Sequence, residues 1–210
     1  MKSCCPPRGA EIFTERVARR DAVRYRRKGV GAVGRRLVEL VRGKGRDVLE
    51  VGGGVGALQL ELLRDGVERA VNVELSPAYE AEAGRLAREA RVETRIDRRV
   101  LDFARAAAEV DAADIVLMHR VVCCYPDMPG LVGAAAAHAR RVLALSYPPD
   151  TLLFRGAARV INFWSRMMRQ EFRFFVHDPP AIFDVAGAHG LRLATRERRR
   201  LWEVAALERA

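Results

Sequence analysis

Residues 48–63 (VLEVGGGVGALQLELL) constrain the fold of this chain more than any other stretch. Val48, Leu49 and Val51 form a short apolar run that is typical of a buried parallel strand. The run ends at a cluster of glycines, and the leucines that follow indicate a helix. A strand that enters a helix through glycines lets a ligand approach the backbone, because no Cβ stands in the way. The helix N-terminus adds free N–H groups. The stretch therefore predicts a ligand-binding α/β unit.

Strand and helix patterns alternate after this stretch. We expect further strands at residues 70–74, 92–96, 114–118 and 142–147, each separated from the next by a helical or loop pattern. Such alternation is typical of a mostly parallel, doubly wound sheet with helices on both faces. Ligands of such sheets bind beyond the carboxyl ends of the strands.

The sequence divides into an N-terminal arm and a main domain, and its remaining segments complete the predicted fold. A basic helical N-terminal arm is expected at 1–46, with helices at 11–28 and 32–41, ahead of a main domain at 47–210. A helical insertion at about 150–178 follows the fifth strand, and it includes a short strand at 172–176. The remaining predicted elements are helices at 77–90, 127–139 and 179–189 and a closing hairpin of 191–195 with 201–207.

Acidic residues stand at the ends of the first two strands. Glu50 precedes the glycines in the pattern Glu50-x-Gly52-x-Gly54-x-Gly56, and Glu74 ends the second strand. Glu50 would repel a pyrophosphate but can hold a cationic amino group, and a carboxylate in the position of Glu74 can accept from both hydroxyls of a ribose. The pattern resembles motif I and the second-strand acid of class I S-adenosylmethionine-dependent methyltransferases. A structural turn without a ligand is the alternative.

The resemblance implies that the cofactor is S-adenosyl-L-methionine. The glycines would approach its methionine part, Glu50 would hold its ammonium group and Glu74 its ribose hydroxyls. Asp102, after the third strand, would accept from the adenine amine, with the ring of Phe103 packed nearby. Each acid has a simpler interpretation as a solvated loop carboxylate. The implied cofactor-binding residues are Glu50, Gly52, Gly54, Gly56, Glu74, Asp102 and Phe103.

Residues 119–127 (HRVVCCYPD) follow the fourth strand, where this fold usually meets its substrate. His119 and Tyr125 are the candidate catalytic bases, although tyrosine would need a depressed pKa to serve. A structural histidine at a strand end is the alternative for His119. The segment lacks the Asn/Asp-Pro-Pro-aromatic tetrad of adenine-N6 methyltransferases, and Cys123-Cys124 match the nucleophile of RNA cytosine-C5 enzymes poorly.

The four cysteines come as two adjacent pairs, Cys4-Cys5 and Cys123-Cys124. Adjacent cysteines suit neither a disulfide framework nor the C-x₂₋₄-C spacing of structural zinc, so we expect no metal site. Buried, inert thiols are the favoured interpretation of Cys123 and Cys124, and a mobile terminus that of Cys4 and Cys5. The alternative is that all four thiols capture a thiophilic species.

Positive charge is concentrated in the N-terminal arm. Residues 1–46 hold 14 basic and 4 acidic side chains, whereas residues 47–210 hold 23 of each. The predicted helix at 11–28 is poorly amphipathic, so it either lies over the cofactor mouth, with Tyr25 or Arg27 near an anionic group, or is a solvated arm. A second hypothesis is an RNA- or other nucleic-acid-binding protein, or a nucleic-acid methyltransferase, that binds phosphates with this arm. A third is a non-catalytic domain that binds the cofactor or a membrane surface.

Residues 151–170 (TLLFRGAARVINFWSRMMRQ) form a strongly amphipathic helical pattern. Leucine, aromatic and methionine side chains cover one broad face, and four arginines gather on the other. Such a helix can pack in the core, cover an apolar substrate, or lie in a membrane interface. No apolar run approaches the length of a spanning helix and no signal peptide is evident, so a cytoplasmic protein is expected.

The whole chain resembles a group of small bacterial methyltransferases that is loosely similar to magnesium-protoporphyrin O-methyltransferases. The matching residues are the Cys-Cys start, YRRKG at 25–29 and VVCCYPD at 121–127. His119 departs from the aspartate expected in these relatives. The favoured prediction is a methyltransferase that acts at O, N or S of a small, apolar molecule, and a carboxylate acceptor would need no base.

Overall fold

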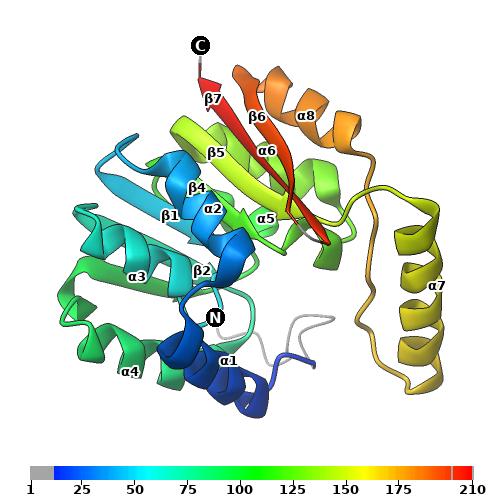
Figure 1. Ribbon diagram of the computed structural model, residues 1–210, viewed down its shortest axis with the longest axis horizontal. Coiled ribbons are helices and arrows are strands. Elements are labelled where there is room, and N and C mark those ends of the chain that lie inside the picture. The colour runs from blue at the N-terminus through cyan, green and yellow to red at the C-terminus, as the bar shows by residue number, and fades with distance from the viewer. Residues whose placement is uncertain (1–11, 200, 210) are drawn as a thin grey trace.

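A seven-stranded sheet forms the centre of the protein, in a computed structural model that describes residues 12–199 and 201–209. The strand order is β3-β2-β1-β4-β5-β7-β6 (Figure 1). β1 to β5 are parallel, and β7 runs antiparallel between β5 and β6. The strands are β1 (Asp47–Val51), β2 (Arg69–Glu74), β3 (Ile96–Val100), β4 (Ala113–His119), β5 (Ala139–Tyr147), β6 (Leu191–Arg199) and β7 (Trp202–Arg209). The predicted α/β class and mostly parallel, doubly wound sheet are therefore confirmed.

Helices cover both faces of the sheet, because side chains alternate along each buried strand. Val48 of β1 joins a core with α1 to α4, whereas its neighbour Leu49 joins a second core with α5, α6 and α8. Ile115 and Val116 of β4 divide in the same way. The helices are α1 (Glu15–Lys28), α2 (Gly31–Val41), α3 (Ala57–Arg64), α4 (Glu80–Glu89), α5 (Phe103–Ala106), α6 (Met128–His138), α7 (Leu152–Met167) and α8 (Pro179–Ala188).

Two elements of the predicted N-terminal arm pack against the main domain. α2 buries Leu37 and Val41 completely, and α1 buries Ala18, Ala22 and Tyr25. Val23 of α1 is 45% exposed, which agrees with the poor amphipathicity predicted for this helix. The division at residue 46 stays a prediction, but these contacts show that α1 and α2 contribute to the core.

Several basic side chains of the predicted N-terminal arm form ion pairs with carboxylates of residues 47–210. These pairs reduce the positive charge that is free to bind a nucleic acid. Arg26 binds Glu89 at 2.6 Å, and Arg36 binds Glu197 at 2.5 Å. The other pairs are Arg42–Asp65, Lys44–Glu208 and Arg46–Glu68. Nucleic-acid binding stays a prediction, and the ion pairs seen among the described residues do not support it.

Two predicted strands are wrong in position or type. Val92, Thr94 and Ile96 suggested a third strand at 92–96, but Glu93–Arg95 form a 3₁₀ turn and β3 begins at Ile96. β3 is an edge strand with sequence IDRRV, so its charged side chains hide the apolar alternation. Residues 172–176 form no strand. Their backbone instead contacts the loop after β4, where the Phe175 N–H donates to the Cys123 carbonyl at 2.7 Å.

α7 stands apart from the rest of the molecule, at the edge seen on the right of Figure 1. Thr151 caps its N-terminus by accepting the Phe154 N–H at 3.3 Å. Asn162 fixes the helix to the returning chain, because its side-chain amide exchanges two hydrogen bonds with the backbone of Phe174, at 2.9 and 2.7 Å. The predicted helical insertion after the fifth strand is confirmed. None of the described helices has both the length and the apolar character required to cross a membrane.

Candidate functional site

The glycine loop joins β1 to α3 at the carboxyl edge of the sheet, between neighbours β2 and β4. Gly52, Gly54 and Gly56 all have positive φ, at 64°, 54° and 77°. A Cβ at Gly52 would lie 2.5 Å from a methyl of Val121, so only glycine fits there. This position, where neighbouring parallel strands lead to opposite sides, is the place where doubly wound sheets bind ligands.

Glu74 connects the end of β2 to the glycine loop. Its Oε2 accepts the Gly54 N–H at 2.8 Å, and its Oε1 accepts the Ser76 N–H at 3.0 Å. The side chain is buried, which raises the pKa of its carboxyl above the ordinary value, while the two N–H groups oppose that rise. The structure thus brings the predicted ribose acceptor into direct contact with the predicted methionine loop.

Glu50 lies under the same loop and is 3% exposed. The Gln59 N–H, in the first turn of α3, donates to its Oε2 at 3.2 Å. Burial, with a smaller contribution from the nearby charge of Glu74, raises the pKa of Glu50 to about 8. Within the part of the chain that the structure describes, no cation is in hydrogen-bond contact with this carboxyl, so its ionised form would gain from a ligand ammonium.

Arg98 of β3 belongs to this site, although sequence reasoning missed it. Its Nη2 donates to the Gly54 carbonyl at 3.1 Å and binds Glu80 at 2.8 Å. Its charge lowers the pKa of both Glu50 and Glu74, so it acts as their shared counter-charge. Its Nη1 is buried and forms no hydrogen bond with any of the described residues. The only available signal was the basic pair in IDRRV, which the misplaced third strand obscured.

Asp102 and Tyr125 are brought together, although 23 residues separate them in sequence. The Tyr125 hydroxyl donates to both carboxylate oxygens of Asp102, at 2.9 and 3.1 Å. Burial and the Asp102 carboxylate raise the pKa of Tyr125 to about 12. The prediction of Tyr125 as a base required a depressed pKa, so this geometry argues against that role.

Phe103 is the one predicted cofactor residue whose side chain lies away from the site. It is 3% exposed and packs edge-on against His138 of α6, with ring centroids 5.3 Å apart. The packing of this ring beside an adenine stays a prediction, and the burial of the ring against α6 argues against it. Phe103 anchors α5 in the core, which positions Asp102 just before the helix begins.

His119 is the last residue of β4, at the same carboxyl edge of the sheet as the glycine loop. Its Nδ1 is 2.8 Å from the Ser146 Oγ of β5. Burial, together with the charges of Arg120 and Arg24, lowers the pKa of His119 to about 3. The imidazole is therefore neutral at ordinary pH but is a weak base.

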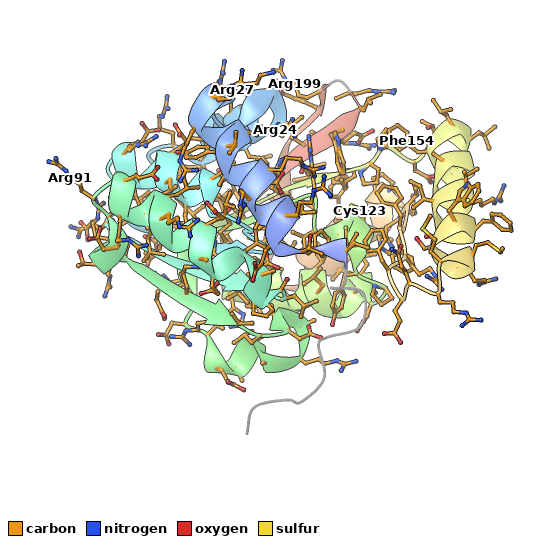
Figure 2. The ribbon with its side chains drawn as sticks, turned by 90° about the horizontal axis from the view of Figure 1, so that it is seen from below. Arg24, Arg27, Arg91, Cys123, Phe154 and Arg199 are labelled. Atoms are coloured by element: carbon orange, nitrogen blue, oxygen red, sulfur yellow. The ribbon has the colours of Figure 1, made fainter. Side chains whose placement is uncertain are left out.

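Arg24 of α1 and Arg120 bring two positive charges to this end of β4. Arg120 adopts a left-handed backbone conformation, with φ 61°, and its guanidinium lies 4.8 Å from the ring centre of Trp202. Arg24, labelled in Figure 2, lies close enough for its charge to lower the pKa of Arg120. Within residues 12–199 and 201–209, no carboxylate forms an ion pair with either guanidinium.

Cys123 and Cys124 follow, with their Sγ atoms 3.7 Å apart. Cys123 is buried and Cys124 partly exposed, so the predicted burial holds for the first alone. Cys124 is near enough to Glu74 to feel its charge. Cys4 and Cys5 lie outside the described residues. Among the residues that are described, no three potential ligands gather into a metal site.

Comparison with known proteins places this arrangement in a family. A family model described as a methyltransferase domain matches residues 22–195. No curated protein matches the chain. The match covers most of the sequence and confirms the resemblance to methyltransferases.

Solved structures share the fold. Magnesium protoporphyrin IX methyltransferase from Synechocystis, with bound S-adenosylhomocysteine, is 20% identical with a TM-score of 0.70, over 95% of this chain and 99% of that one. An O-methyltransferase family protein from Burkholderia thailandensis is 18% identical with a TM-score of 0.67, over 84% of this chain but 56% of that one. A family 2 O-methyltransferase from Planctomyces limnophilus, in complex with apigenin, is 16% identical with a TM-score of 0.68, over 93% of this chain and 62% of that one. The chain therefore belongs to the methyltransferase-domain family.

Proposed function

We propose that the chain binds S-adenosylmethionine at the glycine loop and transfers its methyl group to a small, apolar molecule. The observation that carries this proposal is the pair of buried carboxyls, Glu50 and Glu74, at the ends of β1 and β2 beside glycines that leave the backbone open. Glu50 suits the ammonium group and Glu74 the ribose hydroxyls, while Asp102 can accept from the adenine amine. The Synechocystis structure contains S-adenosylhomocysteine on the same fold, which supports this choice of ligand.

The cofactor supplies an electrophilic methyl group on a sulfonium when it is bound. The protein then has to orient the acceptor and exclude water. Neither candidate base suits proton removal at neutral pH, because the pKa of His119 is about 3 and that of Tyr125 is about 12. We therefore propose that the acceptor atom arrives without a proton to lose.

A carboxylate is the acceptor that the surrounding charge favours. Arg24 and Arg120 bring positive charge to the end of β4, and among the described residues no carboxylate forms an ion pair with either, although Asp21 lies near enough to Arg120 to act on its pKa. Arginine suits this task because its planar donors match a carboxylate. The Burkholderia and Planctomyces proteins are named as O-methyltransferase family members, which is consistent with an oxygen acceptor.

The cofactor is tested by calorimetric titration with S-adenosylhomocysteine at low and moderate salt. We expect micromolar, salt-insensitive binding by the wild type and a loss of at least about ten-fold in Glu74→Ala, since charged hydrogen bonds are removed. Glu68→Ala, at an exposed position before β2, is the matched control. Melting curves of Glu74→Ala and Glu74→Gln show whether the fold survives. Absent binding by the wild type, or unchanged affinity in both folded Glu74 variants, would contradict the site.

The acceptor is tested by transfer of labelled methyl groups from S-adenosylmethionine to apolar carboxylic acids and to the corresponding alcohols. We expect methyl ester formation with the acids alone, at a rate that is flat between about pH 6 and 8 when S-adenosylmethionine is saturating, because Glu50 is then already ionised and no catalytic base titrates there. Arg120→Gln should raise KM for the acid several-fold, with a smaller change in kcat. Methylation of the alcohols, or a rate that follows a single ionisation in this range, would reject the carboxylate proposal.

A further inference from the structure

The apolar face of α7 points away from the protein. Eight of the twelve large apolar side chains that are exposed in the described chain belong to α7 or to the residue that follows it. Leu152 is 86% exposed and Trp164 is 57% exposed. The eight are Leu152, Leu153, Val160, Ile161, Phe163, Trp164, Met167 and Met168.

The orientation of α7 follows from its buried residues. At about 100° per residue, the eight side chains project from one side of the helix, centred on Val160. Ala158 and Ser165, which are buried, project from the opposite side, as does Asn162, which binds the Phe174 backbone. Figures 1 and 2 both show α7 at the edge of the molecule, and in Figure 2 the labelled Phe154 lies where the helix meets the body. The helix therefore packs through the narrow side that holds Ala158, Asn162 and Ser165 and leaves its broad apolar side uncovered.

Positive charge borders the uncovered face. Residues 151–173 hold five arginines and one acidic side chain. Arg155 is paired with Asp150 at 2.5 Å, whereas Arg159, Arg166 and Arg169 are exposed. At helical spacing Arg159 and Arg166 lie along one margin of the apolar face. A helix with aromatic and leucine side chains on one face and arginines beside it fits an anionic lipid interface.

We propose that α7 docks the protein on an anionic membrane surface, with its apolar face in the lipid headgroup region. Charge complementarity selects this occupant over a second copy of the chain, since a second copy would bring its own arginines and a further net charge of +10 to the contact. The helix lies in the plane of the interface, because it is too short and too charged to span the membrane. This inference does not depend on methyl transfer.

Co-sedimentation of the full chain with vesicles tests the proposal. We expect binding to phosphatidylcholine vesicles that contain phosphatidylglycerol, weak binding to phosphatidylcholine alone, and loss of binding at high salt. Tryptophan emission should move to shorter wavelength on binding, and Trp164→Phe should remove the shift while Trp202→Phe keeps it. Failure of the wild type to bind anionic vesicles at low salt would overturn the proposal.

Variants separate a lipid contact from general charge attraction. The double variant Val160→Glu/Trp164→Glu should lower vesicle affinity by at least about ten-fold, because two exposed apolar side chains no longer enter the lipid. Leu193→Glu/Leu201→Glu makes the same charge change at exposed apolar positions of the closing hairpin and should bind close to wild type. Each of Arg159→Gln and Arg166→Gln should cost about five-fold. Equal losses in the two double variants would reject docking through α7. A dimer in sedimentation velocity that only the α7 variant dissociates would assign the face to a second copy instead.

Discussion

The Gln59 N–H of α3 donates to the Oε2 of Glu50 at 3.2 Å, which links the glycine loop to a buried carboxyl at the end of β1. Because burial raises the pKa of Glu50 to about 8, the folded protein holds a proton there at neutral pH that the unfolded chain has released. The folded state thus binds more protons between the ordinary pKa of 4.5 and about 8, and this group makes the protein less stable as pH rises through that window.

Glu50→Gln should therefore stabilise the protein at pH 8 and have little effect at pH 4.5. Glutamine keeps the shape of the side chain and removes the cost of ionising a buried group. We expect a gain of roughly 1–2 kcal/mol at pH 8, or about 2–8 °C in Tm for a chain of this size. Thermal melts of the wild type and Glu50→Gln between pH 4.5 and 8 measure this difference in Tm, with Glu68→Gln as the exposed control. A difference in Tm that does not grow with pH would contradict the raised pKa.

Binding of S-adenosylhomocysteine at pH 7 should release about one proton. The proposed contact with the ligand ammonium favours the ionised form of Glu50, so its pKa must fall when the ligand binds. Calorimetric titrations in buffers of different ionisation enthalpy measure the number of protons released. The release should vanish in Glu50→Gln, with weaker affinity. Proton uptake by the wild type, or release that persists in the variant, would place the ammonium elsewhere.

Tyr125 and Asp102 should make unequal contributions to cofactor affinity. The Tyr125 hydroxyl donates to Asp102 and has a pKa of about 12, so it orients the carboxylate and takes no proton. Tyr125→Phe should weaken S-adenosylhomocysteine binding by no more than about ten-fold, whereas Asp102→Ala should cost about ten- to hundred-fold, since a charged acceptor is lost. Calorimetric titration of both variants with S-adenosylhomocysteine measures the two losses of affinity. A larger loss in Tyr125→Phe than in Asp102→Ala would mean that the tyrosine contacts the ligand directly.

The sequence was sufficient for the parts of the site that depend on topology. The carboxyl ends of parallel strands meet at one edge of a sheet, so placing Glu50 and Glu74 at strand ends was enough to predict that both lie beside the glycine loop. The structure agrees, with Glu74 bonded to Gly54. The start of the helix predicted at 127–139 depends on equally local chemistry, because the Asp127 side chain accepts the Gly130 N–H at 3.0 Å.

Features that depend on how distant elements are oriented relative to one another could not be predicted from the sequence. Periodicity defined the apolar face of α7, but not that Asn162 and Ala158 would turn this face outward. The pairing of Tyr125 with Asp102 joins two loops whose approach no local pattern encodes. Arg98 was missed because an edge strand of charged residues carries no apolar alternation.

Cys124 should react with iodoacetamide well before Cys123. The two thiols lie 3.7 Å apart, so a Cys124 thiolate can accept the hydrogen of Cys123, which lowers the pKa of Cys124 and raises that of Cys123. Cys123 is also buried, whereas Cys124 is partly exposed. Mass spectrometry of peptides from timed alkylation at neutral pH separates the two sites from each other and from Cys4 and Cys5.

Two further measurements show that this reactivity arises from the pair and from its place beside Glu74. Cys123→Ala removes the hydrogen-bond donor, so alkylation of Cys124 should slow by about two- to ten-fold, as the loss of one hydrogen bond to the thiolate implies. Saturating S-adenosylhomocysteine should protect Cys124, because its thiol lies near enough to the Glu74 carboxylate to feel its charge. Unchanged alkylation in Cys123→Ala would mean that the thiols do not share a proton. Alkylation of Cys124 at the same rate with bound ligand would place this thiol outside the cofactor site.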